Sequence, residues 1–417
     1  MHLLRNLSVI AVGCAVGLGI TEAGLRLVGF SRPFFYTKDF LRGSSLRPGA
    51  EGWVQTEGEA YVRVNSDGLR DREHAIAKPP RTLRIAILGD SFAEAFQLPV
   101  DKTFWTVLGD RLQACPAVAG RQVEIINFGV GGYGTAQELI TLRHFAWKYT
   151  PDIVLLAFFT GNDLRNNLRE LNNREPIPYF VYKGNRLVLD DSFSEPLRAY
   201  AAPGATRRRR WFYSLVNRSR VIQLANWIRV LLKNGALQNG AVQHRPPQNP
   251  FIRMASNEKS AFEGKEIGLD EEVFFPPKDA PWREAWHVTE GILRLMRDDV
   301  HQHDAQFWIV TLSTGLQVYP DRSVRQSFLH QHGLENLFYP DLRIRAFAER
   351  EQIRVVTLAP EMAKYSESHQ LFLHGFHKPL LGFGHWNETG HRIAGEIIAS
   401  QMCSGLRRDA TTRLVHR

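Results

Sequence analysis

The sequence predicts an α/β fold, in which a mostly parallel β-sheet is covered by helices on both faces. Short, continuously apolar runs fit buried strands, and segments with helical periodicity alternate with them from residue 83 onward. The composition agrees, because 44% hydrophobic and 23% charged residues are ordinary for a packed protein and exclude a disordered one. At 417 residues, the chain can bury a full hydrophobic core without stabilisation by disulfides or bound metals.

The elements of this sheet follow one another along the chain. Strands are expected at 83–88, 123–127, 152–157, 306–311 and 353–357. Helices are expected at 103–114, 135–149, 282–301 and 387–402. The helix at 135–149 opens with Thr135 and Glu138 in capping-box spacing, and Leu139, Leu142 and Ala146 form its apolar face.

The N-terminus predicts a hydrophobic helix within residues 1–30. Arg5 precedes an apolar stretch of about 15 residues, and Glu22 follows it. A comfortable membrane span needs ~20 residues, so the stretch fits a signal-peptide core or a signal anchor. No clear small-x-small cleavage site follows, which favours an uncleaved anchor, with a cleaved signal and secretion as the alternative.

The orientation of this anchor is predicted from the flanking charges. The short basic N-terminus favours export of the body, whereas Arg26, Arg32, Lys38 and Arg42 on the other flank argue against export. We expect an inner-membrane anchor with the folded body on the periplasmic, extracytoplasmic side.

Charge and cysteine content exclude further classes. The net charge is +9, and part of it lies in the run 207–210 and in the tail. It fits a solvated basic surface, or a face near anionic lipid or an acidic polymer. No nucleic acid is expected as a partner, because no recognised binding motif accompanies the charge. Three cysteines cannot form a disulfide framework, and no CxxC zinc pattern exists.

The remaining organisation is an extension, a main domain and a tail. Residues 31–82 read as an N-terminal linker or extension with a short strand at 61–64, residues 83–402 as the main domain, and 403–417 as a basic tail. The main domain carries an insertion at about 164–281, too long for an ordinary connection. It contains a predicted hairpin at 179–189, a basic helix at 211–232 and a loop at 238–250. Three roles stay open for it: a lid that selects substrate, peripheral packing, or contact with a lipid surface.

Polar and glycine-rich segments follow the strands, where parallel sheets bind ligands. Gly89-Asp-Ser-Phe92 follows the first strand, the glycine-rich 127–134 the second, and Phe159-Thr-Gly-Asn-Asp163 the third; 384–391 lies near the C-terminus. Together they supply a hydroxyl, a glycine N–H, a carboxamide and an imidazole, which are the parts needed for acyl transfer.

These four segments, in this order, resemble those of the SGNH (GDSL) hydrolases. The resemblance runs from about residue 83 to 399, interrupted by the insertion, and it implies a flavodoxin-like three-layer sandwich with no metal or organic cofactor. It implies that Ser91 is the nucleophile and His385 the general base. Oxyanion donors would be the Ser91 N–H, the Gly132 N–H and the Asn162 side chain. The GxSxG elbow of the α/β-hydrolases is absent.

One feature departs from the family pattern. The family usually has an Asp two or three residues before the catalytic histidine, but no carboxylate lies between Glu367 and His385. Three alternatives follow. A backbone carbonyl orients His385; a carboxylate from elsewhere does so, with Asp163, Asp190 and Asp191 as candidates; or the site is slow or inactive as a hydrolase.

Other histidines offer rival interpretations. His391 is a rival base, although its place in the closing helix favours packing or capping. His374 and His377 could join His385 in a metal site, but no nearby carboxylate or cysteine completes one.

The sequence thus predicts a membrane-anchored serine esterase that cleaves or transfers a short acyl group. An acylated envelope carbohydrate is the expected substrate, and a lipid or thioester is the near alternative. A non-catalytic envelope binding module on the same fold is the hypothesis from another class, because the usual Asp is missing.

Overall fold

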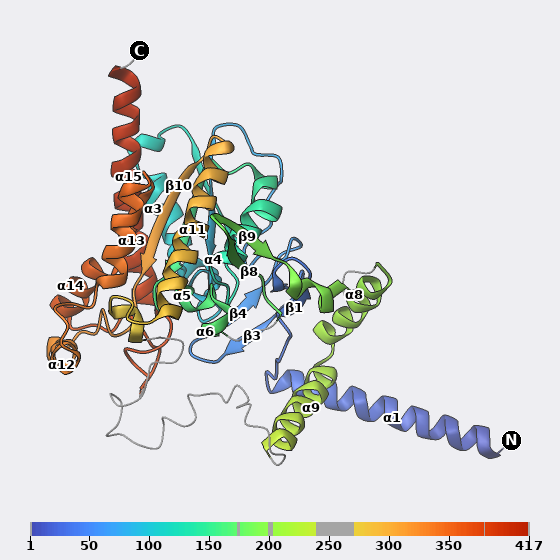
Figure 1. The fold of residues 1–417 in the computed structure, drawn as a ribbon. Helices are drawn as coiled ribbons and strands as arrows, with labels where there is room; N and C mark the ends of the chain where they lie inside the picture. Colours follow the sequence, from blue (N-terminus) through green and yellow to red (C-terminus); the bar gives the residue numbers. More distant parts are fainter. Residues whose placement is uncertain (1, 173–175, 199–202, 239–270, 379, 416–417) are drawn as a thin grey trace.

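A five-stranded parallel sheet with helices on both faces forms the centre of the protein (Figure 1), which confirms the predicted α/β fold. The computed structural model describes residues 2–172, 176–198, 203–238, 271–378 and 380–415. The sheet contains β5 (Thr82–Gly89), β6 (Gln122–Asn127), β7 (Ile153–Phe159), β10 (Gln306–Leu312) and β11 (Arg354–Thr357), in the order β11-β10-β7-β5-β6. Each expected strand is present within one or two residues at each end.

The strand order decides which loops meet. All pairings in this sheet are parallel, and β5 lies between β6 and β7. The carboxyl ends of these three strands therefore lie side by side at one edge, with Gly89 paired to Ala157 and Ile87 paired to Asn127. The segments that follow the three strands consequently share one rim of the sheet.

Helices pack on the two faces through separate apolar clusters. One face is covered by α3 (Phe104–Gln113), α14 (Ala359–His369) and α15 (Glu388–Val415). The other is covered by α4 (Thr135–Thr141), α11 (Ala280–Gln302) and α13 (Tyr339–Arg350). Other helices of the body are α2 (Ser91–Glu94), α5 (Asp163–Asn166), α6 (Arg169–Asn172) and α12 (Arg322–His332), with the 3₁₀ turns η1 (Val100–Lys102), η2 (Pro116–Val118), η5 (Ser192–Leu197) and η6 (Glu271–Phe274).

Two expected helices differ in extent. The helix predicted at 135–149 is α-helical only to Thr141, and it continues as a π-helical segment, η3 (Leu142–Ala146), and a 3₁₀ turn, η4 (Trp147–Tyr149). The closing helix α15 runs beyond 402 to Val415 and includes most of the predicted tail. Gly405 lies where α15 passes Trp308, since a Cβ there would be 2.7 Å from the indole ring.

Residues 31–82, predicted as a linker or extension with one short strand at 61–64, contain two antiparallel hairpins. The first pairs β1 (Tyr36–Asp39) with β2 (Gly43–Leu46), and the second pairs β3 (Glu51–Gln55) with β4 (Glu59–Arg63). Alternation of buried and exposed residues in β4 places Ala60 and Val62 inward. These residues pack in one cluster with Val130 and Tyr133, which follow β6. The hairpins are therefore packed against the rim of the central sheet.

The N-terminal helix α1 (His2–Leu27) extends away from the body (Figure 1). Within the described residues, Arg5–Leu27 is the one helix long and apolar enough to cross a membrane, with 23 residues and a mean hydropathy of 1.7. A signal sequence has the same length and composition. The apolar side chains of this helix are exposed, which fits either a membrane anchor or a signal segment.

The insertion contains a hairpin of β8 (Tyr179–Lys183) and β9 (Arg186–Asp190), followed by α8 (Pro203–Arg218) and α9 (Arg220–Gln238). The prediction of one helix at 211–232 is wrong, because the helix is interrupted at Ser219. The Ser219 hydroxyl accepts the N–H of Ile222, and the Glu22 carboxylate accepts the N–H groups of Arg220 and Val221. These bonds satisfy the first N–H groups of a new helix. The predicted loop at 238–250 lies almost wholly outside the described residues.

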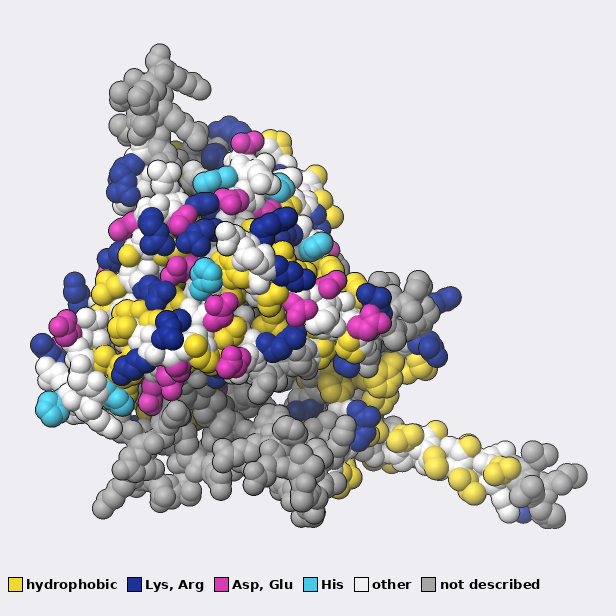
Figure 2. Space-filling model, viewed as in Figure 1, with side chains coloured by type: hydrophobic (Ala, Val, Ile, Leu, Met, Phe, Trp, Pro, Cys, Tyr) yellow, Lys and Arg dark blue, Asp and Glu magenta, His cyan; other side chains and the backbone are white. Residues whose placement is uncertain are grey.

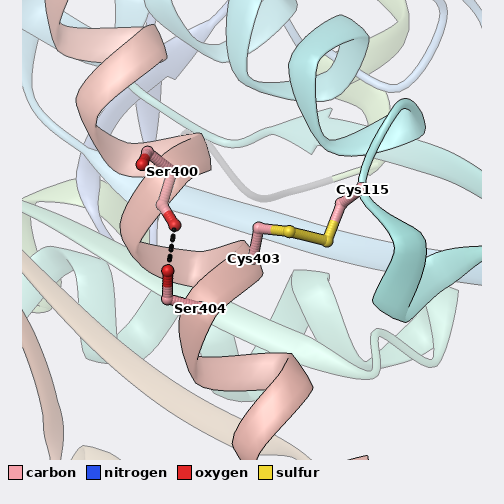
Figure 3. The surroundings of a disulfide bond; sticks show 4 residues. All are labelled: Cys115, Ser400, Cys403 and Ser404. Carbon is pink, nitrogen blue, oxygen red and sulfur yellow. Dashed lines mark hydrogen bonds between the residues drawn. A yellow bond between two sulfur atoms is a disulfide. The ribbon is translucent and has the colours of Figure 1, made fainter.

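One disulfide joins Cys115, which follows α3, to Cys403 in α15, with Cα atoms 5.8 Å apart (Figure 3). The cysteine count excluded a framework of several disulfides, but it did not reveal this single pair. The pair closes a loop of 288 residues that contains most of the central sheet. Cys14 is free and exposed.

Replacing both Cys115 and Cys403 with serine should lower the free energy of unfolding by ~2–4 kcal/mol, because the unfolded chain regains the freedom that the cross-link removes. Urea denaturation of the oxidised protein, followed by tryptophan fluorescence, measures this loss. Cys14→Ser is the matched control and should leave the midpoint unchanged. Equal midpoints for the double variant and the wild type would contradict a stabilising disulfide.

Candidate active site

Ser91 lies at a tight turn between β5 and α2. The preceding Asp90 carboxylate accepts the N–H of Phe92 at 2.9 Å and so caps this short helix. Gly89 allows the turn, because a Cβ there would lie 2.9 Å from the Cβ of Ala93 and 3.1 Å from that of Ala157. The turn therefore presents the Ser91 hydroxyl, partly exposed, at the carboxyl end of the sheet.

His385 reaches Ser91 from the segment before α15. The Ser91 hydroxyl oxygen lies 2.8 Å from Nε2 of His385, although the two residues are 294 positions apart. The carbonyl of His385 accepts the N–H of Gly375 at 3.0 Å, and the ring of Phe92 lies 5.0 Å from the imidazole ring. Backbone and side-chain contacts thus hold the imidazole against the hydroxyl.

The partner on the other side of His385 is Glu57. Its two carboxylate oxygens lie 2.8 and 3.0 Å from Nδ1 of His385, and one of them also accepts the His385 backbone N–H at 2.9 Å. Glu57 lies in the turn between β3 and β4, in the extension that precedes the main domain. Gly384 permits the approach, because a Cβ there would lie 2.8 Å from the carboxylate. The contact fixes the tautomer with Nδ1–H donating to Glu57 and Nε2 accepting from Ser91.

Of the alternatives drawn from the sequence, a carboxylate from elsewhere in the chain is the one that matches the structure, but the residues named for it are wrong. A carboxylate, not a backbone carbonyl, contacts Nδ1 of His385, and it is none of the three named candidates. Asp163 accepts the N–H of Phe159, Asp190 pairs with Arg169, and Asp191 is exposed beside η5. The sequence did not predict a role for Glu57, because Glu57 lies 328 residues from His385 and no fixed spacing connects the two residues. The only sequence feature pointing to it was the alternating strand pattern beside it.

Charge effects in this pair favour the two charged forms. Burial acts to lower the pKa of His385, but the charge and hydrogen bond of Glu57 outweigh it and raise the pKa above its ordinary value of 6.5. Burial likewise acts to raise the pKa of Glu57, but His385 outweighs it and leaves that pKa lowered. Glu57 is therefore suited to stabilise an imidazolium that forms when His385 takes a proton.

Gly132 and Asn162 lie on the two sides of the Ser91 turn, after β6 and β7. Gly132 has a positive φ of 79°, which suits glycine, and Asn162 precedes α5. The Asn162 side chain lies close enough to Asp90 to favour its charged form, which opposes burial, the stronger effect that raises the Asp90 pKa to about 6. Asn162 is thus adjacent to the residue before Ser91.

The two backbone donors named from the sequence are available for a ligand. Throughout the part of the chain that the structure describes, the N–H groups of Ser91 and Gly132 donate to no protein acceptor. Ser91, Gly132, Asn162 and His385 are each partly exposed. Free N–H groups beside an exposed hydroxyl are the arrangement that stabilises an oxyanion.

Glu94 and Tyr36 support the glycine loop. Glu94 accepts the N–H of Gly131 at 2.9 Å and the hydroxyl of Tyr36 at 2.7 Å. Burial raises the pKa of Glu94 to about 7, although the Gly131 and Tyr36 hydrogen bonds oppose this effect. The hairpin residue Tyr36 therefore helps to fix the peptide next to Gly132.

The rival histidines have structural contacts. Nδ1 of His391 accepts the N–H of Phe104, and burial lowers the pKa of His391 to about 3. His374 lies between the Gly384 carbonyl and the Ser313 hydroxyl, so both of its ring nitrogens are engaged, and burial lowers its pKa to about 4. Among the described residues, no group of three or more His, Cys, Asp or Glu side chains is placed to hold a metal ion.

Comparisons with known proteins give likenesses to esterases. No family model matches the chain. An arylesterase from Vibrio mimicus is 30% identical over 82 residues, which are 20% of this chain and 39% of that protein. The chain thus spans well under half the length of this curated relative.

Three solved structures match the chain at low sequence identity and low TM-score. The acetyl xylan esterase AlAXEase is 10% identical, with 76% of this chain and 98% of that chain covered and a TM-score of 0.36. A G-D-S-L family lipolytic protein from Desulfitobacterium hafniense is 10% identical, with 76% and 99% covered and a TM-score of 0.33. Axe2, an acetylxylan esterase from Geobacillus stearothermophilus, is 9% identical, with 77% and 94% covered and a TM-score of 0.36.

Replacing Glu57 with Gln should lower the pKa of His385, because burial then acts without the opposing carboxylate. Titration of the histidine ring signals by NMR, with His385 assigned from a His385→Gln spectrum, measures the shift. Glu59→Gln, at an exposed position of β4 in the same hairpin, should leave the titration unchanged. An unaltered pKa in Glu57→Gln would show that the carboxylate does not act on the imidazole.

Proposed function

We propose that this protein is a serine esterase of the SGNH type, with Ser91 as nucleophile, His385 as general base and Glu57 as the orienting carboxylate. The observation that carries the proposal is the continuous hydrogen-bond chain from Ser91 through His385 to Glu57. A hydroxyl is a weak nucleophile at neutral pH, and a base within hydrogen-bond reach activates it. A carboxylate behind the base stabilises the charge that the base acquires.

In the first step, the Ser91 oxygen attacks the ester carbonyl carbon while its proton passes to Nε2 of His385. The carbonyl oxygen becomes an oxyanion, and the N–H groups of Ser91 and Gly132 and the side-chain amide of Asn162 donate to it. The imidazolium then gives the proton to the leaving alcohol oxygen as the ester bond breaks. Ser91 carries the acyl group as a new ester.

In the second step, His385 removes a proton from a water molecule, which attacks the acyl carbon. The second oxyanion collapses, the proton returns to the Ser91 oxygen, and the carboxylic acid leaves. A sugar hydroxyl in place of water would yield a transferred ester by the same proton transfers. Hydrolysis needs no co-reactant beyond water.

The binding-module hypothesis loses the observation that motivated it. That hypothesis rested on the missing Asp before His385, and Glu57 now supplies a carboxylate at the same ring nitrogen. A protein that had abandoned catalysis would have no evident need for a carboxylate, an imidazole and an exposed hydroxyl in hydrogen-bonding order. The enzyme proposal therefore stands ahead of the binding module.

We further propose that the substrate is a short acyl ester on a carbohydrate and that the enzyme works outside the cytoplasm, anchored by α1. The carbohydrate follows from the family resemblance, and the names of the acetylxylan esterases of similar fold point the same way. The compartment is supported by the Cys115–Cys403 disulfide, because such bonds persist in oxidising environments. An apolar N-terminal helix is compatible with that location.

A fluorophosphonate probe should label the wild-type protein and should not label Ser91→Ala, because the probe forms a bond only with an activated serine oxygen. In-gel fluorescence after labelling, with circular dichroism to confirm folding, provides the measurement. Ser323→Ala, which removes an exposed hydroxyl on α12, should label like the wild type. A folded wild type that never labels would favour the binding module.

Replacing Asn162 with Ala should lower kcat on p-nitrophenyl acetate by ~10²–10³-fold, because one oxyanion donor is lost. The Michaelis constant should change little, since the donor acts on charge that develops after binding. Asn336→Ala, on the connection before α13, is the control and should retain the wild-type rate. Wild-type turnover in Asn162→Ala would remove this side chain from the oxyanion site.

A further inference from the structure

Helices α8 and α9 form a basic, acid-free arm on the side of the molecule near α1. Residues 203–238 contain eight Arg or Lys residues and no Asp or Glu. Several large apolar side chains of the arm are nevertheless exposed: Trp211, Phe212, Leu215, Trp227, Ile228 and Leu232. Figure 2 shows hydrophobic side chains gathered there, above the exposed helix α1. Exposed aromatic side chains interleaved with arginine require an explanation, because they are costly in water alone.

The two faces of α8 differ. The inner face packs on the N-terminal extension: the hydroxyl of Tyr213 lies 3.2 Å from that of Thr37, and Arg47 donates to the side chain of Asn217 at 2.6 Å. The opposite face carries Trp211, which is 68% exposed, and Leu215. Three exposed arginines flank these side chains on the outer face: Arg207, Arg208 and Arg218. The outer face is thus both apolar and cationic.

Hydrogen bonds join the arm to the C-terminal end of the candidate membrane span. Glu22 of α1 accepts the N–H groups of Arg220 and Val221 at 3.0 Å each. Arg26 donates to the carbonyl of Arg218. These bonds join the C-terminal part of α1 to the point where α8 meets α9 (Figure 1). If α1 enters a bilayer, the α8–α9 junction lies at its surface.

We propose that the outer face of α8, together with Trp227 and Ile228 of α9, docks on the anionic membrane surface into which α1 inserts. Arginines near the surface are attracted by anionic headgroups, and tryptophan side chains favour the headgroup level. The proposal rests on α1 acting as an anchor, as proposed above. It does not depend on the esterase activity.

Docking would bring the candidate active site close to the bilayer. The inner face of α8 contacts Thr37 in β1, and the neighbouring residue Tyr36 donates its hydroxyl to Glu94. Glu94 lies at the end of the short helix that begins with Ser91. The path from the docked face to the nucleophile is thus a short series of direct contacts. A molecule at the membrane surface could then present its ester to Ser91 without leaving the membrane.

The test uses the full chain reconstituted in vesicles of phosphatidylcholine and phosphatidylglycerol whose acyl chains are brominated, because bromine quenches tryptophan fluorescence at contact. Vesicle flotation first shows whether α1 anchors the chain. The brominated lipid should then quench part of the wild-type fluorescence. In Trp211→Phe, most of the quenching assigned to α8 should be absent. Trp147→Phe, outside the α8–α9 arm and stacked on His303, is the matched control and should be quenched like the wild type.

Charge is tested by the double variant Arg207→Glu and Arg208→Glu. Its Trp211 quenching should fall several-fold, and wild-type quenching should fall similarly at high salt or in neutral lipid. The same reversal at Arg407 and Arg408 of α15 is the control and should have no effect. Both control residues are exposed, and α15 lies on the other side of the body from α1 (Figure 1).

The outcomes separate the possibilities. Chains that float with vesicles but show equal quenching for wild type and Trp211→Phe would overturn the docking of α8 while leaving the anchor intact. Chains that do not float would overturn both the anchor and the docking. Self-association that is lost in Trp211→Phe, with no bromine quenching, would mean that a second copy covers this face instead of lipid. None of these results depends on fluorophosphonate labelling at Ser91, which tests the esterase separately.

Discussion

The hydrogen bonds between Glu57 and His385 are the contact on which the rest of the site depends. They join a turn in the N-terminal extension to the segment before the last helix, and both carboxylate oxygens take part. The same contact raises the pKa of the imidazole against the effect of burial. Without it, His385 would be a partly buried ring with no carboxylate at Nδ1, and the proton transfer proposed from Ser91 would create an uncompensated charge.

This dependence gives the extension a role beyond packing. Its hairpins bury Ala60 and Val62 against residues that follow β6, and Tyr36 supports the glycine loop through Glu94. The extension therefore contacts both His385 and the loop that contains Gly132. It also contacts α8, which is joined to α1 through Glu22. The rim that contains Ser91, the extension, the insertion and the candidate anchor form one connected series of contacts.

Local sequence patterns were sufficient to predict the strands and the residues that directly follow them. The five strands were predictable because buried parallel strands are continuously apolar, and the segments after them contain Ser91, Gly132 and Asn162. The single helix expected at 211–232 was wrong because Glu22, about two hundred positions away, satisfies the first N–H groups of α9. When a distant element caps the end of a helix, the sequence around that end contains no capping signal.

The sequence by itself determined the order of strands and helices, the hydroxyl, the glycine loop, the carboxamide and the imidazole, because each follows from local periodicity or from a short segment. Only the tertiary structure decided that Glu57 orients His385 and that Cys115 pairs with Cys403. Both pairs join residues about three hundred positions apart, at 328 and 288. Contacts over such separations are set by how β5 lies between β6 and β7 and by how the hairpins pack on that rim, and no local pattern encodes either arrangement.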